Sequence, residues 1–132
     1  MTLLLLDTDA VIDILNGMHA TQHFVDLLLT TGDTLCSCDV VVTEVLSGTR
    51  PVERDNVGVF LDTLDFLPST PEVGRVAGRW RFDLARRGIA LATPDAIIAA
   101  TAVVWNATLV TGNVRDYPMS ELTIVALPRS SR

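Results

Sequence analysis

The sequence has no lysine, little cysteine and no apolar run long enough to span a membrane. All ten of its basic residues are arginines, in a chain of 132 residues. A site that needs an ammonium group is therefore excluded, although arginine can still bind phosphate through two parallel hydrogen bonds. The longest apolar runs, LLLL at 3–6 and IIAATAVVW at 97–105, are shorter than the roughly 20 residues of a transmembrane helix. The start of the chain also lacks the features of a signal peptide, which predicts a cytoplasmic protein with no membrane contact.

The two cysteines and the net charge narrow the function further. Cys36 and Cys38 stand two positions apart, where a strand would turn both toward the same face. No second cysteine pair is present to complete a zinc site, so we interpret them as small buried apolar side chains in a reducing compartment. The formal net charge of −6 argues against binding of nucleic acid through bulk positive charge. Any contact with RNA must then be local.

Strands and helices alternate along the chain, and no repeat or long polar linker divides it, so residues 1–132 are predicted to form one domain. Asp39 and Thr93 are expected to cap two of the helices. Near-continuous apolar strands separated by helices predict an α/β fold, in which helices cover both faces of a parallel sheet. The predicted strands cover 3–6, 34–38, 107–111 and 122–126, and the predicted helices cover about 10–15, 20–30, 39–48, 52–64, 71–87 and 93–105.

Asp95 is the only charged residue between Arg87 and Arg115. It stands at the start of a helix whose other residues are almost all apolar, which predicts a buried helix with Trp105 in the core. A carboxylate in such surroundings must find a partner or become neutral. Stabilisation by the helix N-terminus, worth about 0.3–1 kcal/mol, explains Asp95 about as well as a functional role does.

Three more acidic residues stand at positions where a functional role is plausible: past the ends of predicted strands or on an apolar helix face. Asp7 directly follows the first predicted strand, and sheets of this class form their sites past the carboxyl ends of strands, although Asp7 could be only a helix cap. Glu44 shares a helix face with apolar residues, and a solvated glutamate would usually have polar neighbours. Asp116 lies past the end of another strand, in a loop with Thr111 and Asn113, and loops are commonly rich in aspartate.

Together the four acids predict a metal site. Three of them follow strand ends, so all four can meet in one crevice, where bare carboxylates would repel each other and destabilise the fold. A cluster of carboxylate oxygens is what Mg²⁺ or Mn²⁺ prefers. Such an ion lowers the pKa of a bound water, positions a phosphodiester and neutralises charge in the transition state, with one or two ions possible.

Four segments resemble, in order and spacing, the PIN-domain nucleases, and specifically the VapC toxins of bacterial toxin–antitoxin pairs. They are LLLLDTDAVID, VVTEVLSG, TPDAIIAATA and TGNVRDY. The resemblance extends from residue 1 to about 126, but residues 49–90 match only in their helical character. Gly112 stands where an arginine is frequent in the family, and Tyr117 where phenylalanine is usual.

The resemblance implies a fold, an activity and partners. The fold would be a three-layer α/β sandwich with a parallel, about five-stranded sheet, and the activity a Mg²⁺- or Mn²⁺-dependent endoribonuclease that hydrolyses RNA. The expected partners are a second copy of the chain in a homodimer and a VapB-type antitoxin in a heterocomplex. The implied site residues are Asp7 and Asp95 as metal ligands, Glu44 and Asp116 completing the catalytic set, and Thr111, Asn113 and Asp9 in support. Whether Asn113 or Asp116 completes the set stays open.

Two other functions also stay open from the sequence. LLLLDTDAV fits the start of a haloacid-dehalogenase-like phosphatase, in which Asp7 would be the nucleophile and Asp9 the general acid. Such enzymes ordinarily hold the phospho-aspartate with a lysine, which this chain lacks. The second alternative is a catalytically inactive PIN-like binding module. The complete set of four acids argues against it, because loss of Asp7 or Asp95 would be expected in such a module.

Overall fold

A computed structural model describes residues 1–128 and centres on a five-stranded sheet in the order β3-β2-β1-β4-β5. Every pairing between neighbouring strands is parallel. The α/β fold with a five-stranded parallel sheet is therefore confirmed. The strands are β1 (Leu3–Leu6), β2 (Thr34–Cys38), β3 (Asp65–Leu67), β4 (Thr108–Thr111) and β5 (Ile124–Ala126).

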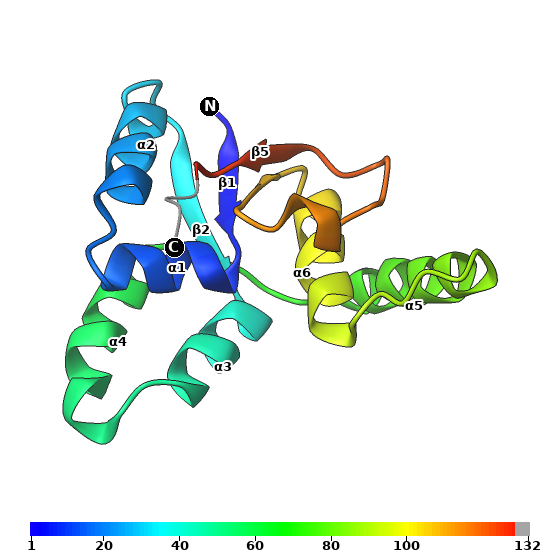
Figure 1. Cartoon of the computed structure of the whole chain (residues 1–132), viewed down its shortest axis with the longest axis horizontal. Helices are drawn as coiled ribbons and strands as arrows, with labels where there is room; N and C mark the ends of the chain where they lie inside the picture. The colour runs from blue at the N-terminus through cyan, green and yellow to red at the C-terminus, as the bar shows by residue number, and fades with distance from the viewer. Residues whose placement is uncertain (129–132) are drawn as a thin grey trace.

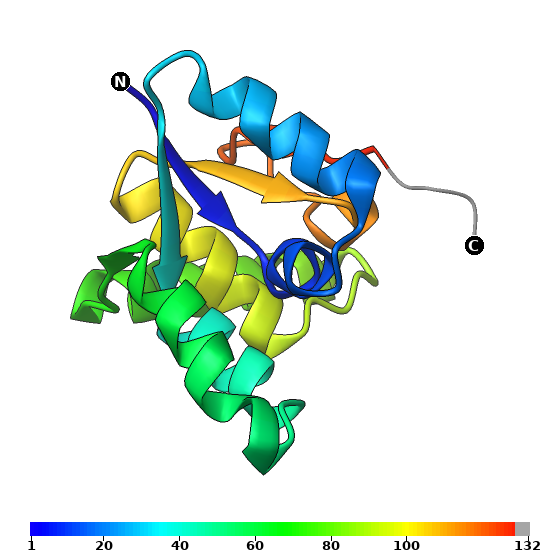
Figure 2. The ribbon, with the colours of Figure 1, turned by 90° about the vertical axis from the view of Figure 1, so that its left-hand side faces the viewer.

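Helices lie on both sides of this sheet. In Figure 2, α2 lies in front of the strands and α6 behind them, and Figure 1 shows the same two helices on opposite sides of β1. No helix among residues 1–128 is long and apolar enough to cross a membrane. The helices are α1 (Thr8–Leu15), α2 (His19–Leu29), α3 (Asp39–Ser47), α4 (Arg54–Asp62), α5 (Pro71–Arg86) and α6 (Thr93–Val104), with short 3₁₀ helices η1 (Pro51–Glu53) and η2 (Val114–Asp116).

The central strands and α6 owe their burial to uniformly apolar sequence. Leu4, Leu5 and Leu6 of β1 are all buried, as expected for a parallel strand with helices on both faces. Cys36 and Cys38 are fully buried in β2, which confirms their interpretation as core residues. Burial, together with the charge of Asp65, raises the pKa of the Cys36 thiol to about 11, so this thiol is protonated and unreactive at neutral pH.

The chain order places the carboxyl ends of β1 and β4 side by side at the centre of the sheet. The chain runs outward from β1 through β2 to β3, then crosses back to β4, so β1 and β4 are neighbours far apart in sequence. Their register pairs Leu6 with Val110, and the Asp7 amide extends the pairing by donating to the Val110 carbonyl at 3.1 Å. A topological switch point of this kind is where sheets of this class form their sites.

Several local predictions were wrong. Strand β3 was missed because only Leu67 of its three residues is buried, so no apolar run indicates it. The cap of α3 is Cys38 rather than Asp39, whose carboxylate instead accepts from the Ser69 amide at 3.2 Å. Helix α6 is capped by the extended Ala92, so Thr93 is already helical.

Trp105 does not belong to the core either. Its side chain is 38% exposed, and its indole N–H donates to the Pro68 carbonyl at 2.9 Å at the end of α6. A tryptophan with its polar end bonded at the surface is a common compromise, because the ring is apolar and the N–H needs a partner. The remaining predicted strands and helices agree with the structure to within a few residues.

Candidate functional site

Asp7 is the buried centre of the polar cluster at the switch point. It follows β1, caps α1 and is 3% exposed. Its Oδ1 accepts from the Ala10 amide at 2.9 Å, and its Oδ2 accepts a short hydrogen bond from the Thr111 hydroxyl. An aspartate buried this deeply is stable only with such donors. Asp7 is therefore held in one orientation by a helix end and by the neighbouring strand.

Thr111 and Asn113 extend this network from the end of β4. The Thr111 hydroxyl accepts from the Asn113 amide at 2.9 Å while it donates to Asp7. The side-chain amide of Asn113 donates a short hydrogen bond to Oδ2 of the exposed Asp9. The structure thus brings together Asp7, Asp9, Thr111 and Asn113, the residues that the sequence predicted as one ligand and its support.

Glu44 approaches the same edge from α3. Its carboxylate is half-buried, and its Oε1 accepts from the Thr8 hydroxyl at 2.6 Å. Thr8 is the first residue of α1, so this bond ties α3 to the loop that carries Asp7. The second oxygen, Oε2, is left to accept from another group. The hydrogen bond from Thr8 thus fixes the orientation of the Glu44 carboxylate near Asp7.

Asp95 carries the clearest electrostatic signal. It lies in the first turn of α6, half-buried. Burial raises the pKa of its carboxyl above the ordinary value, and the negative charges of Asp116, Glu44 and Asp9 raise it further. No arginine is among the groups that shift it. Only the hydrogen bond from Tyr117 opposes this shift, so the Asp95 carboxylate lies among repelling negative charges, where a cation would be stabilised.

Tyr117 was noted in the sequence only as a departure from the family pattern, and its contact with Asp95 was missed. Its side chain is buried, and its hydroxyl lies 3.5 Å from Oδ1 of Asp95. Burial and the charges of Asp7, Asp95, Asp116 and Glu44 raise the pKa of its phenol, so the hydroxyl stays protonated. It can therefore only donate toward these acids. Its signal in the sequence was slight: it is the single tyrosine of the chain and follows Asp116.

Thr8 was also missed, and nothing in the sequence indicated it, because its partner Glu44 is 36 positions away. Asp116 lies exposed at the end of η2, and its charge acts on both Asp95 and Tyr117. All four predicted acids therefore share one edge of the sheet. We call Asp7, Asp9, Glu44, Asp95 and Asp116 the acidic edge.

The carboxylates of the acidic edge lie near one another but do not surround one common metal position. Among residues 1–128, no three histidine, cysteine, aspartate or glutamate side chains stand close enough together to hold one metal ion between them. Asp7, Asp9 and Glu44 are each turned onto a hydroxyl or amide donor. The charges of Asp9 and Glu44 nevertheless act on Asp95, and those of Asp7 and Glu44 act on Tyr117 beside it, so the acids influence a common region. What they offer is a set of carboxylate oxygens, the donor type that Mg²⁺ and Mn²⁺ select.

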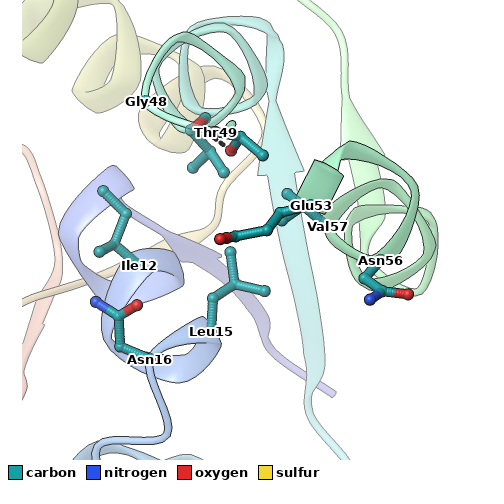
Figure 3. Close-up of a pocket in the computed structure, with 9 residues that line it drawn as sticks. Ile12, Leu15, Asn16, Gly48, Thr49, Glu53, Asn56 and Val57 are labelled. Carbon is teal, nitrogen blue, oxygen red and sulfur yellow. Dashed lines mark hydrogen bonds between the residues drawn. The ribbon is translucent and has the colours of Figure 1, made fainter. Parts of the chain in front are cut away.

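Two hollows lie beside α3. The first, about 310 Å³ in volume, adjoins the acidic edge and includes Glu44 in its wall; we call it the α3–α6 pocket. The second, about 370 Å³, lies between α1, α3 and α4 and contains none of the acidic-edge residues; we call it the α1–α4 pocket. Figure 3 shows the Glu53 side chain reaching into it toward Leu15. The α1–α4 pocket is lined by Ile12, Leu15, Asn16, Val45, Gly48, Thr49, Glu53, Asn56 and Val57.

The chain is similar to known proteins over most of its length. The family model described as PIN domain matches residues 4–118. Ribonuclease VapC19 of Mycobacterium tuberculosis is 33% identical over 117 residues, which cover 87% of this chain and 92% of that protein. Ribonuclease VapC10 of the same organism is 32% identical over 120 residues, covering 90% and 89% of the two chains.

Solved structures show the same fold. One is the crystal structure of VapBC2 from Rickettsia felis bound to a DNA fragment from the VapBC2 promoter. A chain of that structure superposes with a TM-score of 0.83 at 22% identity, and the match covers 96% of this chain and all of that one. A chain of VapBC-1 from nontypeable Haemophilus influenzae gives a TM-score of 0.80 at 21% identity, covering 95% and 98%. The similarity therefore spans the whole described fold.

Proposed function

The chain belongs to the PIN-domain family, and on this basis we propose that it is a metal-dependent endoribonuclease that acts as the toxin of a toxin–antitoxin pair. Its relatives VapC19 and VapC10 are named ribonucleases. The observation that carries the proposal is the field at Asp95, where three further acids raise the carboxyl pKa and no arginine opposes them. Such a site is costly for a protein that only binds partners, and useful for one that recruits a cation.

The donor chemistry of the acidic edge fits a divalent metal ion of the kind that one or two carboxylates hold together with several waters. The donor set is made of carboxylate oxygens alone, which suits Mg²⁺ or Mn²⁺ rather than zinc. Asp7 and Asp95 would hold the ion, with Glu44 and Asp116 completing the set. A bound ion would polarise the phosphodiester and make water a better nucleophile. Its charge would also relieve the repulsion that raises the pKa of Asp95.

The other polar groups orient these acids. The Thr111 hydroxyl fixes Asp7, and Asn113 fixes Asp9, so neither carboxylate must lose rotational freedom when substrate arrives. Glu44 accepts from Thr8 through Oε1, which leaves Oε2 to take a proton from the attacking water. The protonated Tyr117 hydroxyl donates toward Asp95 and cannot act as a base. Asn113 in this scheme supports the site rather than replacing Asp116.

Partners follow from the relatives. The Rickettsia felis structure is of a VapBC assembly, and a similar structure from Klebsiella pneumoniae is of a toxin–antitoxin complex. We extend this to the present chain: a VapB-type antitoxin would bind it, and two copies would form a homodimer. Residues 1–132 would act as one nuclease unit, of which 129–132 lie outside the described part.

The test is cleavage of RNA by the purified protein with and without Mg²⁺. Cleavage should require the metal, stop with EDTA, and fall by at least about 100-fold in Asp7→Asn and in Asp95→Asn, because removal of a direct ligand costs no less than removal of an outer one. Glu53→Gln in the α1–α4 pocket is the matched control and should cut like the wild type. Equal cleavage by wild type, Asp7→Asn and Asp95→Asn would overturn the proposal.

A phosphatase assay distinguishes the proposed ribonuclease from the main alternative, a haloacid-dehalogenase-like phosphatase. The haloacid-dehalogenase-like interpretation predicts hydrolysis of p-nitrophenyl phosphate, with Asp7 as nucleophile. The composition of the chain argues against it, because no lysine exists in the chain to hold a phospho-aspartate. Turnover of p-nitrophenyl phosphate without RNA cleavage would favour the phosphatase. Binding of RNA without turnover of either substrate would favour the inactive binding module.

A further inference from the structure

The α3–α6 pocket opens directly beside the acidic edge. It has a volume of about 310 Å³ and lies between the first half of α3 and the start of α6. Glu44 belongs to both the pocket wall and the acidic edge, and Asp95 follows directly after the wall residue Pro94. The remaining wall is formed by Asp39, Val40, Thr43, Thr93 and Ile97.

The chemistry of the wall suits a small, mostly apolar group with a polar rim. Val40 and Ile97 are half-buried apolar side chains, and with Pro94 they give the pocket apolar sides. The exposed residues Asp39 and Thr43 supply a carboxylate and a hydroxyl at the rim. The volume lies at the lower end of the roughly 300–1,000 Å³ typical of small-ligand sites, which suits one small group.

We propose that this pocket binds one unpaired base of the RNA next to the scissile phosphate, and so sets which sequence is cut. The inference rests on the proposed ribonuclease function. Proteins read single-stranded RNA by stacking splayed bases on aromatic side chains or arginine and bonding their edges, and enzymes that take a base out of the stack also hold it between apolar side chains. A phosphodiester at the acidic edge would place its neighbouring base within reach of a pocket that shares Glu44 with that edge.

The rim indicates which bases fit. Asp39 is held in place because its Oδ2 accepts from the Ser69 amide at 3.2 Å, and a carboxylate can only accept hydrogen bonds from a base. The exocyclic amino groups of cytosine, adenine and guanine are donors, and carboxylates accept from the cytosine amino group in nucleic-acid complexes. Uracil has no amino group, and its one ring donor, N3–H, lies between two carbonyl oxygens that repel an approaching carboxylate. The pocket should therefore favour an amino-bearing base over uracil.

The experiment fills the pocket at its exposed rim. Thr43→Trp places a large ring there, and the substituted threonine donates only to the Asp39 carbonyl one turn back, at 2.8 Å. Ser47→Trp is the matched control: Ser47 is exposed on the same helix, donates to the Thr43 carbonyl at 2.7 Å in the same way, and does not line the pocket. Wild type and both variants are incubated with Mg²⁺ and a pool of random-sequence oligoribonucleotides, and the cleaved ends are sequenced.

Wild type and Ser47→Trp should show a preference for amino-bearing bases at one position beside the cut. Thr43→Trp should lose it and cut the preferred sequences about 5- to 150-fold more slowly, the range expected for loss of one base contact of about 1–3 kcal/mol. Cleavage by wild type with no base preference, a preference for uracil, or Thr43→Trp behaving like Ser47→Trp would overturn the pocket while leaving the ribonuclease function intact. Absence of any RNA cleavage by wild type would instead contradict the ribonuclease function itself.

A binding measurement keeps the inference independent of turnover. In EDTA, fluorescence anisotropy compares wild type with Thr43→Trp on a preferred oligoribonucleotide and on the same strand with an abasic site at the recognised position. The wild type should bind the intact strand more tightly, and Thr43→Trp should not distinguish the two. Sedimentation of the free proteins gives the last outcome: if Thr43→Trp alone changes the oligomeric state, a second copy of the chain covers the pocket and the base-binding proposal is wrong.

Discussion

Helix α3 borders two pockets that each contain a glutamate, and the two glutamates differ in whether an arginine neutralises their charge. Glu53 of the α1–α4 pocket forms a short ion pair with Arg50, the only such pair within the described part of the chain. Glu44 of the α3–α6 pocket has no arginine within ion-pair distance among residues 1–128, and its hydrogen-bond partner is the neutral Thr8 hydroxyl. One negative charge is neutralised by the protein itself, and the other is not.

The difference is not a shortage of arginine, since the chain has ten. Helix α5 carries several of these arginines, whereas no arginine is among the groups that shift the pKa of Asp95. Negative charges that repel one another in the folded state lower its stability. We interpret the contrast between Glu44 and Glu53 as in keeping with the proposed metal site beside Asp95.

Apart from replacement of Asp7 or Asp95 itself, the largest effect is expected from Thr111→Val, which removes a buried hydrogen bond of the acidic edge. Valine has nearly the same shape but leaves Asp7 Oδ2 and the Asn113 amide without their partner. RNA cleavage should fall about 10- to 100-fold, and the free energy of unfolding by about 1–3 kcal/mol. Urea denaturation and cleavage assays measure the two effects.

Thr101→Val is the matched control for that change. Thr101 is as fully buried as Thr111, but its hydroxyl donates only to the Ile97 carbonyl of its own helix, at 2.8 Å. Its substitution should leave cleavage unchanged and cost less stability. Equal loss of cleavage in both variants would mean that any buried polar deletion inactivates the protein, and that the Asp7–Thr111 bond has no special role.

The next largest effect is expected from added Mg²⁺, which should stabilise the folded protein by binding at the acidic edge. A ligand that binds only the folded state at a hundredfold excess over its Kd contributes about 2.7 kcal/mol. The melting temperature of the wild type should therefore rise with Mg²⁺ concentration, and that of Asp95→Asn much less. Glu53→Gln should respond like the wild type, because its pocket already has its own counter-charge. An equal rise in all three proteins would indicate binding elsewhere.

Without metal, Asp95→Asn should make the protein more stable, by a few degrees in melting temperature at neutral pH. The raised pKa of Asp95 means that the folded state holds the proton more tightly than the unfolded state, whose value is near 3.8. Stability therefore falls as the pH rises from about 4 through the folded pKa, and the loss is complete above it. The variant lacks this titration, so its advantage should be absent near pH 4 and grow toward neutral pH.

Asp7→Asn should show no such gain, because an amide nitrogen in place of Oδ1 or Oδ2 cannot accept from Ala10 or Thr111. Thermal melts in EDTA between about pH 4 and pH 8 compare the two variants with wild type. A constant difference between Asp95→Asn and wild type across this range would show that charge at Asp95 is not the cause.

The smallest effect is expected in the α1–α4 pocket. Arg50 and Glu53 are 77% and 49% exposed, and solvent screens such pairs strongly. Glu53→Gln should leave the melting temperature within error of wild type at moderate salt. A clear loss of stability would mean that the pair fixes η1 in place, and that the two hollows differ less than their charges suggest.

The sequence was sufficient where a residue stands apart from its neighbours in kind. Asp95 is conspicuous in a long uncharged stretch, and Asp7 directly follows four leucines, so both could be recognised as unusual. The parallel sheet followed from the same apolar runs. Strand β3 could not be found, because two of its three side chains face solvent and only pairing with β2 makes it a strand.

The partners of the acids were beyond the reach of pattern reasoning. The bond from Thr8 to Glu44 and the approach of Tyr117 to Asp95 join residues on different elements, and both depend on how helices pack. Caps were misplaced by one residue at Asp39 and Thr93 because backbone conformation, rather than side-chain type, decided where the helices begin. Residue type indicated the candidate acids, and tertiary packing determined their orientation.

The hydrogen bond between Asp7 and Thr111 joins residues 104 positions apart. Chains are synthesised from the N-terminus, at about 5–20 residues per second. Asp7 thus leaves the ribosome early but meets its fixing partner only after β4 has emerged and paired with β1. A growing chain therefore carries Asp7 without its fixing partner while the next 104 residues are made, and the site can assemble only after β4 has emerged.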